Sequence, residues 1–256
     1  MTHIPPLDPN VAAQKGFRES EERIKRFWKS AGVEARDGGD GGWVVLLDGR
    51  APKTPAGNAI VLPTEAAARL VAEEWNDQGE HLAPATMPAT RLASTAIDRV
   101  SQTRGPVAEE IARYAGSDVL CYLAETPSGL IERQQAEWGP WRDWAARELG
   151  VELHPVEGII HRPQAPEALA RVEALSLEMD DFALTGLATA VPLFGSAVLG
   201  LAVQRGALAG EAALDLSRLD EAFTEERWGV DEEAAARTAA HRAEAALLQR
   251  WFEALR

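Results

Sequence analysis

The sequence has little of what disulfides, metal sites and nucleic-acid binding require. Its 256 residues include one cysteine, Cys121, which excludes an internal disulfide and a multi-thiolate metal site. Basic residues number 26 against 40 acidic ones, so the net charge at pH 7 is −14. This balance argues against sequence-independent nucleic-acid binding, which needs clustered cations. The lone cysteine is typical of a reducing compartment, and the cytoplasm is the expected location.

Catalytic motifs are also missing. There is no phosphate-binding loop, dinucleotide-binding glycine pattern, nucleophile elbow or HExxH motif. The histidines are scattered, so we predict neither a metal site nor a cofactor. Cys121 stands between Leu120 and Tyr122 in an apolar stretch that predicts a helix, where an inert buried thiol is expected. Adjacent carboxylates such as Asp220 and Glu221 point about 100° apart on a helix and share no site. A carboxylate-dependent hydrolase is the alternative function.

One long uncharged stretch raises the question of a membrane span. Residues 182–203 carry no charge over 22 positions, which is enough to cross a bilayer. Three glycines and Pro192 interrupt the stretch, and a proline removes a helical hydrogen bond. Small residues let neighbouring helices approach closely. We therefore predict a buried central pair of helices and no stable membrane insertion.

The first 90 residues mix helix and strand signals. Phe17, Ile24, Phe27 and Trp28 are spaced as the apolar face of an N-terminal helix. The Asp- and Gly-rich residues 37–42 predict a loop, because glycine favours conformations that regular elements forbid.

Two extended segments follow this loop. Residues 43–47 are all apolar and precede Asp48 and Gly49, which together are a strong hairpin turn signal. A second extended segment is expected at residues 59–62. Thr64 is suited to cap the next helix, on which we predict that Trp75 packs between the β-rich part and the helical part.

Strand signals nearly vanish after a Pro-rich segment at residues 81–88, which is typical of a linker. Helices are then expected from about residue 92, from Pro106, and over residues 130–149, 166–179 and 231–256, with one loop at residues 151–161 that includes a short strand. The predicted fold class is therefore α+β. We place an N-terminal α+β domain at residues 1–90 and a C-terminal helical domain at residues 91–256.

An acidic run, LDEAFTEERWGVDEE, occupies residues 219–233. Ala212, Leu216, Leu219 and Phe223 recur in steps of four, three and four, which predicts one helix with a buried apolar face. The Trp-Gly pair at residues 228–229 ends this helix, and an acidic triplet begins the next one. Charge runs of this kind are usually a solvated helix face. The alternative is a presented recognition surface.

Six motifs in this order closely resemble one known family. They are DGRAPKTPAG, EEWNDQ, PATRLASTAID, DVLCYLAETP followed by a Gln-Gln pair and WGPW, FGSAVLGLAV, and RLDEAFTEERWGVDEE. Together they resemble the ATP-twelve family of assembly chaperones for the catalytic head of F-type ATP synthase. The resemblance spans about residues 20–250. Leu123, Gly139 and Thr224 depart from the residues that are frequent in the family.

The resemblance implies a small N-terminal domain with an orthogonal β-sheet and a larger C-terminal helical domain. It also implies a monomeric chaperone without enzyme activity or cofactor, which binds the unassembled α subunit, shields its β-subunit-facing surface and releases it. Such proteins act in the bacterial cytoplasm or the mitochondrial matrix. The family's functional glutamate maps to Glu221 by its position relative to the Trp-Gly pair. Partner-binding residues are accordingly expected at Glu221, Asp220, Glu225, Trp228 and Asp231.

Overall fold

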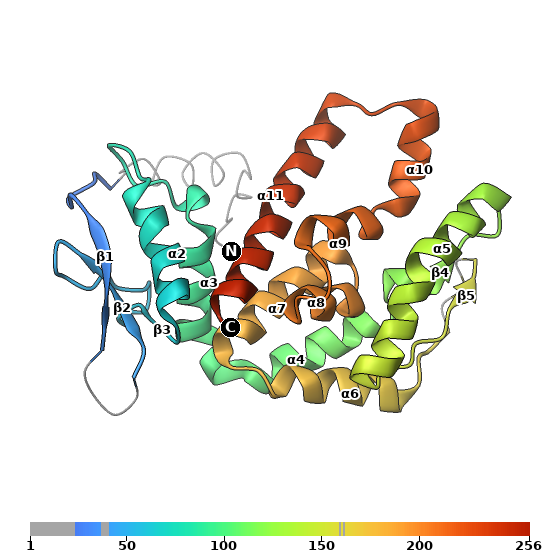
Figure 1. The fold of residues 1–256 in the computed structure, drawn as a ribbon, viewed down its shortest axis with the longest axis horizontal. Coiled ribbons are helices and arrows are strands. Elements are labelled where there is room, and N and C mark those ends of the chain that lie inside the picture. Colours follow the sequence, from blue (N-terminus) through green and yellow to red (C-terminus); the bar gives the residue numbers. More distant parts are fainter. Residues whose placement is uncertain (1–23, 37–40, 159, 161) are drawn as a thin grey trace, which may run out of the picture.

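The computed structural model describes residues 24–36, 41–158, 160 and 162–256. A small three-stranded antiparallel sheet lies at one end of the molecule, and helices make up most of the remainder (Figure 1). This arrangement confirms the predicted α+β class, with a small N-terminal sheet followed by a larger helical region.

The sheet has the order β1-β2-β3, with β1 at Ala31–Ala35, β2 at Trp43–Leu47 and β3 at Val61–Leu62. The predicted hairpin turn follows β2, since Asp48 and Gly49 have φ angles of 47° and 80°. Within the predicted 37–42 loop, residues 37–40 lie outside the described part. Strand β1 was not predicted, because its sequence AGVEA has only one strong strand former.

The predicted N-terminal helix is wrong where it can be checked. Phe17 lies outside the described residues, and residues 24–28 are not helical. They run extended beside residues 80–82, through bonds from Arg26 N to Glu80 O and from Leu82 N to Ile24 O. The indole of Trp28 donates to Trp75 O at 3.1 Å. This buried hydrogen bond outweighs the helical spacing of the apolar residues.

The helices beyond the sheet are α2 Glu65–Asn76, α3 Pro88–Thr95, α4 Ser101–Ala115, α5 Ser128–Trp144, α6 Pro166–Leu177, α7 Asp181–Phe194, α8 Ala197–Gln204, α9 Gly210–Ser217, α10 Leu219–Trp228 and α11 Glu232–Ala254. Shorter elements are η1 Pro84–Thr86, the π-helical turns η2 Ala96–Val100 and η4 Ala145–Leu149, the 3₁₀ turn η3 Val119–Cys121, and a parallel pair of strands, β4 Tyr122–Leu123 and β5 Val156–Glu157. The predicted cap of α2 is confirmed, since Thr64 accepts from Ala67 N. The predicted linker contains η1 and the first residue of α3.

Side chains of α2 join the sheet to the helices. Asn76 exchanges two hydrogen bonds with the backbone of Ala31, at 2.7 and 2.9 Å. Glu74 accepts from Ala89 N and Thr90 N at 2.6 and 2.8 Å, so its carboxylate caps the N-terminus of α3. Burial raises the pKa of Glu74, and these hydrogen bonds act in the opposite direction. The EEWNDQ motif therefore has a structural role.

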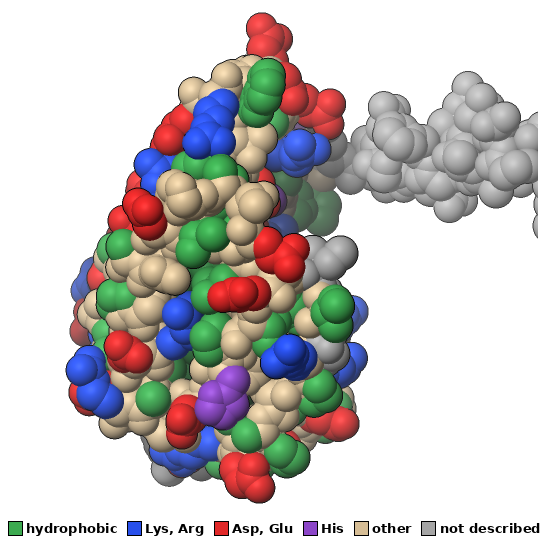
Figure 2. Space-filling view, turned by 90° about the vertical axis from the view of Figure 1, so that its right-hand side faces the viewer, with side chains coloured by type: hydrophobic (Ala, Val, Ile, Leu, Met, Phe, Trp, Pro, Cys, Tyr) green, Lys and Arg blue, Asp and Glu red, His purple; other side chains and the backbone are tan. Residues whose placement is uncertain are grey.

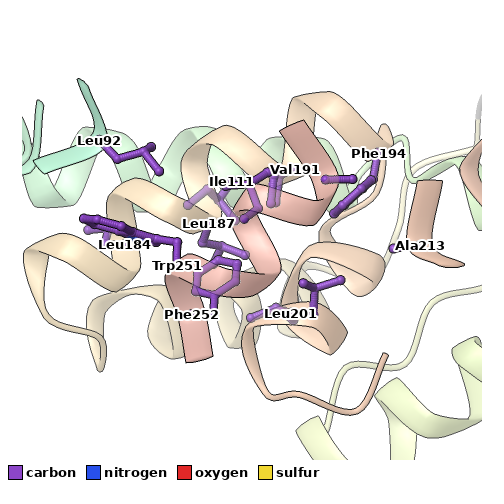
Figure 3. Packing of buried hydrophobic residues seen from close by; sticks show 14 of the residues in the cluster. Leu92, Ile111, Leu184, Leu187, Val191, Phe194, Leu201, Ala213, Trp251 and Phe252 are labelled. Atoms are coloured by element: carbon purple, nitrogen blue, oxygen red, sulfur yellow. The ribbon is translucent and has the colours of Figure 1, made fainter. Parts of the chain in front are cut away.

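The uncharged stretch folds into α7 and α8, which lie in the middle of the core, as predicted (Figure 3). Glycines permit their close packing. A Cβ atom on Gly186 would lie 2.8 Å from side-chain atoms of Trp251 and Phe252, and one on Gly200 would lie 2.9 Å from the side chain of Val191. Among the described residues, no helix is long and apolar enough to cross a membrane.

The last turns of α11 reach the N-terminal part of the chain. Thr64 donates its hydroxyl to Ala254 O, and Arg250 forms an ion pair with Glu73 at 3.2 Å. One cluster of buried hydrophobic residues includes side chains from the sheet, α2 and α11. The domain boundary near residue 90 stays a prediction.

Cys121 lies in the turn η3 and not in an α-helix, which corrects the prediction for this segment. Its thiol is buried, and burial together with the nearby Asp118 raises its pKa to about 12, so it is unreactive as expected. Asp118 is fully buried and accepts from Leu120 N at 3.1 Å and from Val198 N at 3.2 Å, at the start of α8. Burial raises the pKa of Asp118 to about 6.

Candidate functional site

The acidic run does not continue the helix before it. The sequence predicted one helix from about residue 212 to residue 228, but α9 ends at Ser217 and α10 begins at Leu219. In a continuous helix, the carbonyl of Leu216 would accept from Asp220 N. The indole of Trp138 instead donates to this carbonyl at 2.9 Å. Packing against α5 therefore redirects the chain at Arg218, whose φ and ψ angles of −105° and 21° are not helical.

The helix α10 and the first half of α11 project from the body of the molecule and are joined at their outer end (Figure 1). We call residues 219–241 the arch. Its turn forms where predicted, because α10 ends at Trp228 and Gly229 has a φ of 83°, which favours glycine. Asp231 accepts from Ala234 N at 2.8 Å and caps α11.

A cavity of about 860 Å³ lies between the arch and the body. Its lining comes from four helices and is listed here by element: Pro192, Leu193 and Phe194 of α7, Leu214 and Ser217 of α9, Asp220, Glu221, Thr224 and Glu225 of α10, and Ala234, Arg237, Thr238 and His241 of α11, together with Val119, Gly195 and Arg218. The cavity combines apolar side chains with charged side chains of both signs. We call it the arch cavity.

Three of the five predicted site residues have partners within the chain. Asp220 Oδ1 accepts from the buried amide of Gln134 at 2.7 Å. Glu225 forms an ion pair with Arg218 at 2.7 Å, and both side chains are about three-quarters buried. Asp231 is the cap of α11. These contacts fix the direction of α10 and the bend of the arch.

The other two predicted site residues, Glu221 and Trp228, are exposed, and Glu221 lines the arch cavity. Glu221 is exposed and has no ion pair or side-chain hydrogen bond with any described residue. Trp228 is 85% exposed and Val230 beside it is 52% exposed. A single exposed apolar side chain is common, but contiguous exposed apolar surface is typical of interaction sites. The arch thus presents a carboxylate near its base and an apolar tip.

Several contributors to this site were not predicted from the sequence. The ring of Phe223 makes cation–π contacts with two guanidinium groups, with Arg227 at 4.0 Å and Arg133 at 5.7 Å from the ring centre. Arg133 also pairs with Glu226 at 2.8 Å, and this hydrogen bond raises the pKa of Arg133. The α11 side chains of the cavity were missed as well. They are distant in sequence from the acidic run and follow no motif.

Comparison with known proteins identifies the family. Residues 25–146 match the family model described as ATP12 chaperone protein. The chain is 29% identical to the protein atp12, mitochondrial, of Schizosaccharomyces pombe over 224 residues, which is 82% of this chain and 76% of that protein. The crystal structure of Atp12 from Paracoccus denitrificans is 42% identical, covers 91% of this chain and 99% of its own, and has a TM-score of 0.85. The chain belongs to the ATP12 chaperone family. A structure of a protein from Agrobacterium tumefaciens is 39% identical, with a TM-score of 0.86, and covers 98% of this chain and 92% of its own.

Membership in the ATP12 family makes this chain a chaperone of ATP synthase assembly and not an enzyme. In the part of the chain that the structure describes, no group of three or more His, Cys, Asp or Glu side chains is arranged to hold a metal. On the face seen in Figure 2, acidic, basic and hydrophobic side chains are mixed, with acidic side chains at the top, where α10 and α11 are joined.

Proposed function

We propose that this protein binds the unassembled α subunit of F-type ATP synthase, shields the surface of that subunit that faces the β subunit, and releases it during assembly of the catalytic head. The observation that carries the proposal is the arch. It presents Glu221, without an internal partner, and the exposed Trp228 beside a cavity of about 860 Å³.

An exposed tryptophan next to Val230 is suited to anchor a protein partner, because aromatic side chains supply much of the binding energy of small contact regions. A free α subunit would expose apolar surface that is meant for its neighbour, and such patches aggregate. Covering that surface with a projecting arch prevents aggregation without burying the whole subunit.

The acidic side chains suit fast but reversible capture. Charges at the rim of an interface accelerate association more than they raise affinity. Asp220, Glu225 and Asp231 hold the arch in shape through internal bonds, and Glu221 is left to meet the partner. The β subunit then displaces the chaperone by competing for the same surface of the α subunit. We further propose that the protein acts as a monomer in the bacterial cytoplasm.

Co-expression of the tagged chaperone with the α subunit, followed by pull-down, tests the proposal. We expect capture of the α subunit in the absence of the β subunit, and loss of capture when the β subunit is added in excess. The β subunit expressed alone is the control and should not be captured. Capture of neither subunit, or of both equally, would contradict the proposal.

A further inference from the structure

A second cavity, of about 470 Å³, lies between α3 and the loop that joins β2 to β3. Its apolar lining includes the buried side chains of Ile60, Trp75 and Met87. Its charged lining includes Lys53, Arg91 and Arg99, all of which are exposed. We call it the Trp75 pocket. It shares no lining residue with the arch cavity.

The acidic residue in the lining of this pocket, Asp98, is already engaged. Asp98 accepts from Thr54 Oγ1 at 2.7 Å, from Asn58 Nδ2 at 2.9 Å and from Ala56 N at 3.0 Å. Partial desolvation acts to raise the pKa of Asp98, but these hydrogen bonds outweigh that effect. The pKa of Asp98 is therefore lower than its usual value. Its carboxylate therefore stays charged and holds the loop against η2.

The cations of the pocket, by contrast, are available. Among the described residues, none of Lys53, Arg91 and Arg99 forms an ion pair, although Arg99 lies close enough to Asp98 to interact with it electrostatically. Three cations around one pocket are notable in a chain whose net charge is −14. They give this part of the surface a local preference for carboxylate groups.

One residue that lines the pocket, Trp75, has an unsatisfied donor. Trp75 is 8% exposed, and its indole nitrogen is buried without a hydrogen-bond partner among the described residues. Buried polar groups are nearly always paired, so this N–H would gain an acceptor if a shift of its surroundings admitted one from outside the chain. A peptide carbonyl is the commonest acceptor that a protein partner offers.

We propose that the Trp75 pocket binds an extended segment of the client protein that carries an apolar side chain next to a carboxylate. The apolar side chain enters between Ile60 and Met87, and the carboxylate meets Arg91 and Arg99. The volume suits one or two side chains. The proposal rests on the proposed function only in that the ligand is part of a client. It gives the chaperone a second contact, separate from the arch, which raises the effective concentration of the bound subunit.

The test uses the full-length protein with ¹⁵N-labelled tryptophan and observes the indole N–H of Trp75 by NMR. Its signal is assigned by its disappearance in Trp75→Phe. The probe is a blocked pentapeptide in which two leucines alternate with three glutamates, and the control peptide has lysine in place of glutamate. We expect a saturable shift of the Trp75 signal with the glutamate peptide and at least about tenfold weaker binding of the lysine peptide.

The double variant Arg91→Glu/Arg99→Glu should weaken binding of the glutamate peptide by at least about tenfold. Arg36→Glu/Arg147→Glu is the matched control, because it changes the net charge equally at exposed positions outside the pocket. Its binding should be close to wild type. No saturable shift, equal binding of both peptides, or equal effects of the two double variants would overturn the proposal.

This measurement does not require the α subunit. If pull-down fails but the pentapeptide binds as expected, the α subunit is not the client, and peptide binding at the Trp75 pocket is still supported. If the α subunit is captured but the peptide gives no shift, the proposal for the Trp75 pocket is wrong, and the proposed binding of the α subunit through the arch is still supported.

Discussion

The buried amide of Gln134 joins α5 to α10 by donating from Nε2 to Asp220 Oδ1 at 2.7 Å. The same side chain accepts from Ala124 N at 2.7 Å, so both ends of the amide are used. Asp220 thus has an internal partner, although the sequence suggested that it binds a client. Through this bond α5 sets the direction in which α10 leaves the body.

Replacing Gln134 by leucine should destabilise the fold by about 1–3 kcal/mol, because it leaves the backbone N–H of Ala124 and one oxygen of Asp220 without their partner. The neighbouring Gln135 is exposed, and Gln135→Leu should stay within about 0.5 kcal/mol of wild type. Urea denaturation of both variants measures the difference. Equal stabilities would show that the bond contributes nothing.

Glu221→Lys should leave the melting temperature nearly unchanged, since the side chain is exposed and has no ion pair with a described residue. Binding of the α subunit should fall by about tenfold, which corresponds to about 1.4 kcal/mol. Glu132→Lys, at an exposed position of α5 outside the arch cavity, is the control with the same charge change. Calorimetric titration of the α subunit would decide. Normal affinity in a folded Glu221→Lys protein would refute a role for this carboxylate.

The close approach of α9 to α11 predicts a strong effect of one methyl group. A Cβ atom at Gly210 would lie 2.1 Å from Ala245 O, so Gly210→Ala must push the two helices apart and should cost about 1–3 kcal/mol or more. Gly129→Ala provides a comparison, because its nearest neighbour is a Phe223 carbon at 3.9 Å. That variant should be neutral or slightly stabilising. Guanidinium unfolding at 25 °C measures both, and a neutral Gly210→Ala would contradict the packing.

Asp118 should make stability depend on pH. Burial raises its pKa from 3.8 to about 6 in the folded protein. Between these values the folded chain keeps a proton that the unfolded chain has released, so the free energy of unfolding falls as pH rises from about 4 to about 6. The loss is on the order of 3 kcal/mol and persists above this window. Below pH 4 the contribution of Asp118 is fully present.

The variant Asp118→Asn does not titrate, so its free energy of unfolding should decrease less than that of wild type between pH 4 and pH 7. Asp143→Asn, at an exposed position, should follow the wild-type curve. Urea denaturation at several pH values gives the comparison. Parallel curves for wild type and Asp118→Asn would mean that Asp118 titrates alike in the folded and unfolded chains.

Local signals in the sequence were sufficient for several elements. Thr64 caps α2 as predicted, because its side-chain oxygen accepts from the backbone three residues on. The acidic triplet from Asp231 marks the start of α11 as predicted. The turn at Asp48 and the end of α10 at Gly229 follow from positive φ angles that few residues tolerate. The glycines of residues 182–203 correctly indicated close helix packing.

Contacts between distant segments decided the rest. The indole of Trp28 donates to Trp75 O and holds a segment with helical spacing in an extended conformation. The indole of Trp138 donates to the carbonyl of Leu216, where α9 ends and α10 begins. Neither bond has a local signal, because its partners lie 47 and 78 residues apart. The sequence by itself determined the fold class, the cap of α2 and the family. Tertiary structure alone decided which carboxylates of the acidic run are engaged internally and left Glu221 exposed at the arch cavity, because hydrogen-bond partners are assigned only when the helices pack.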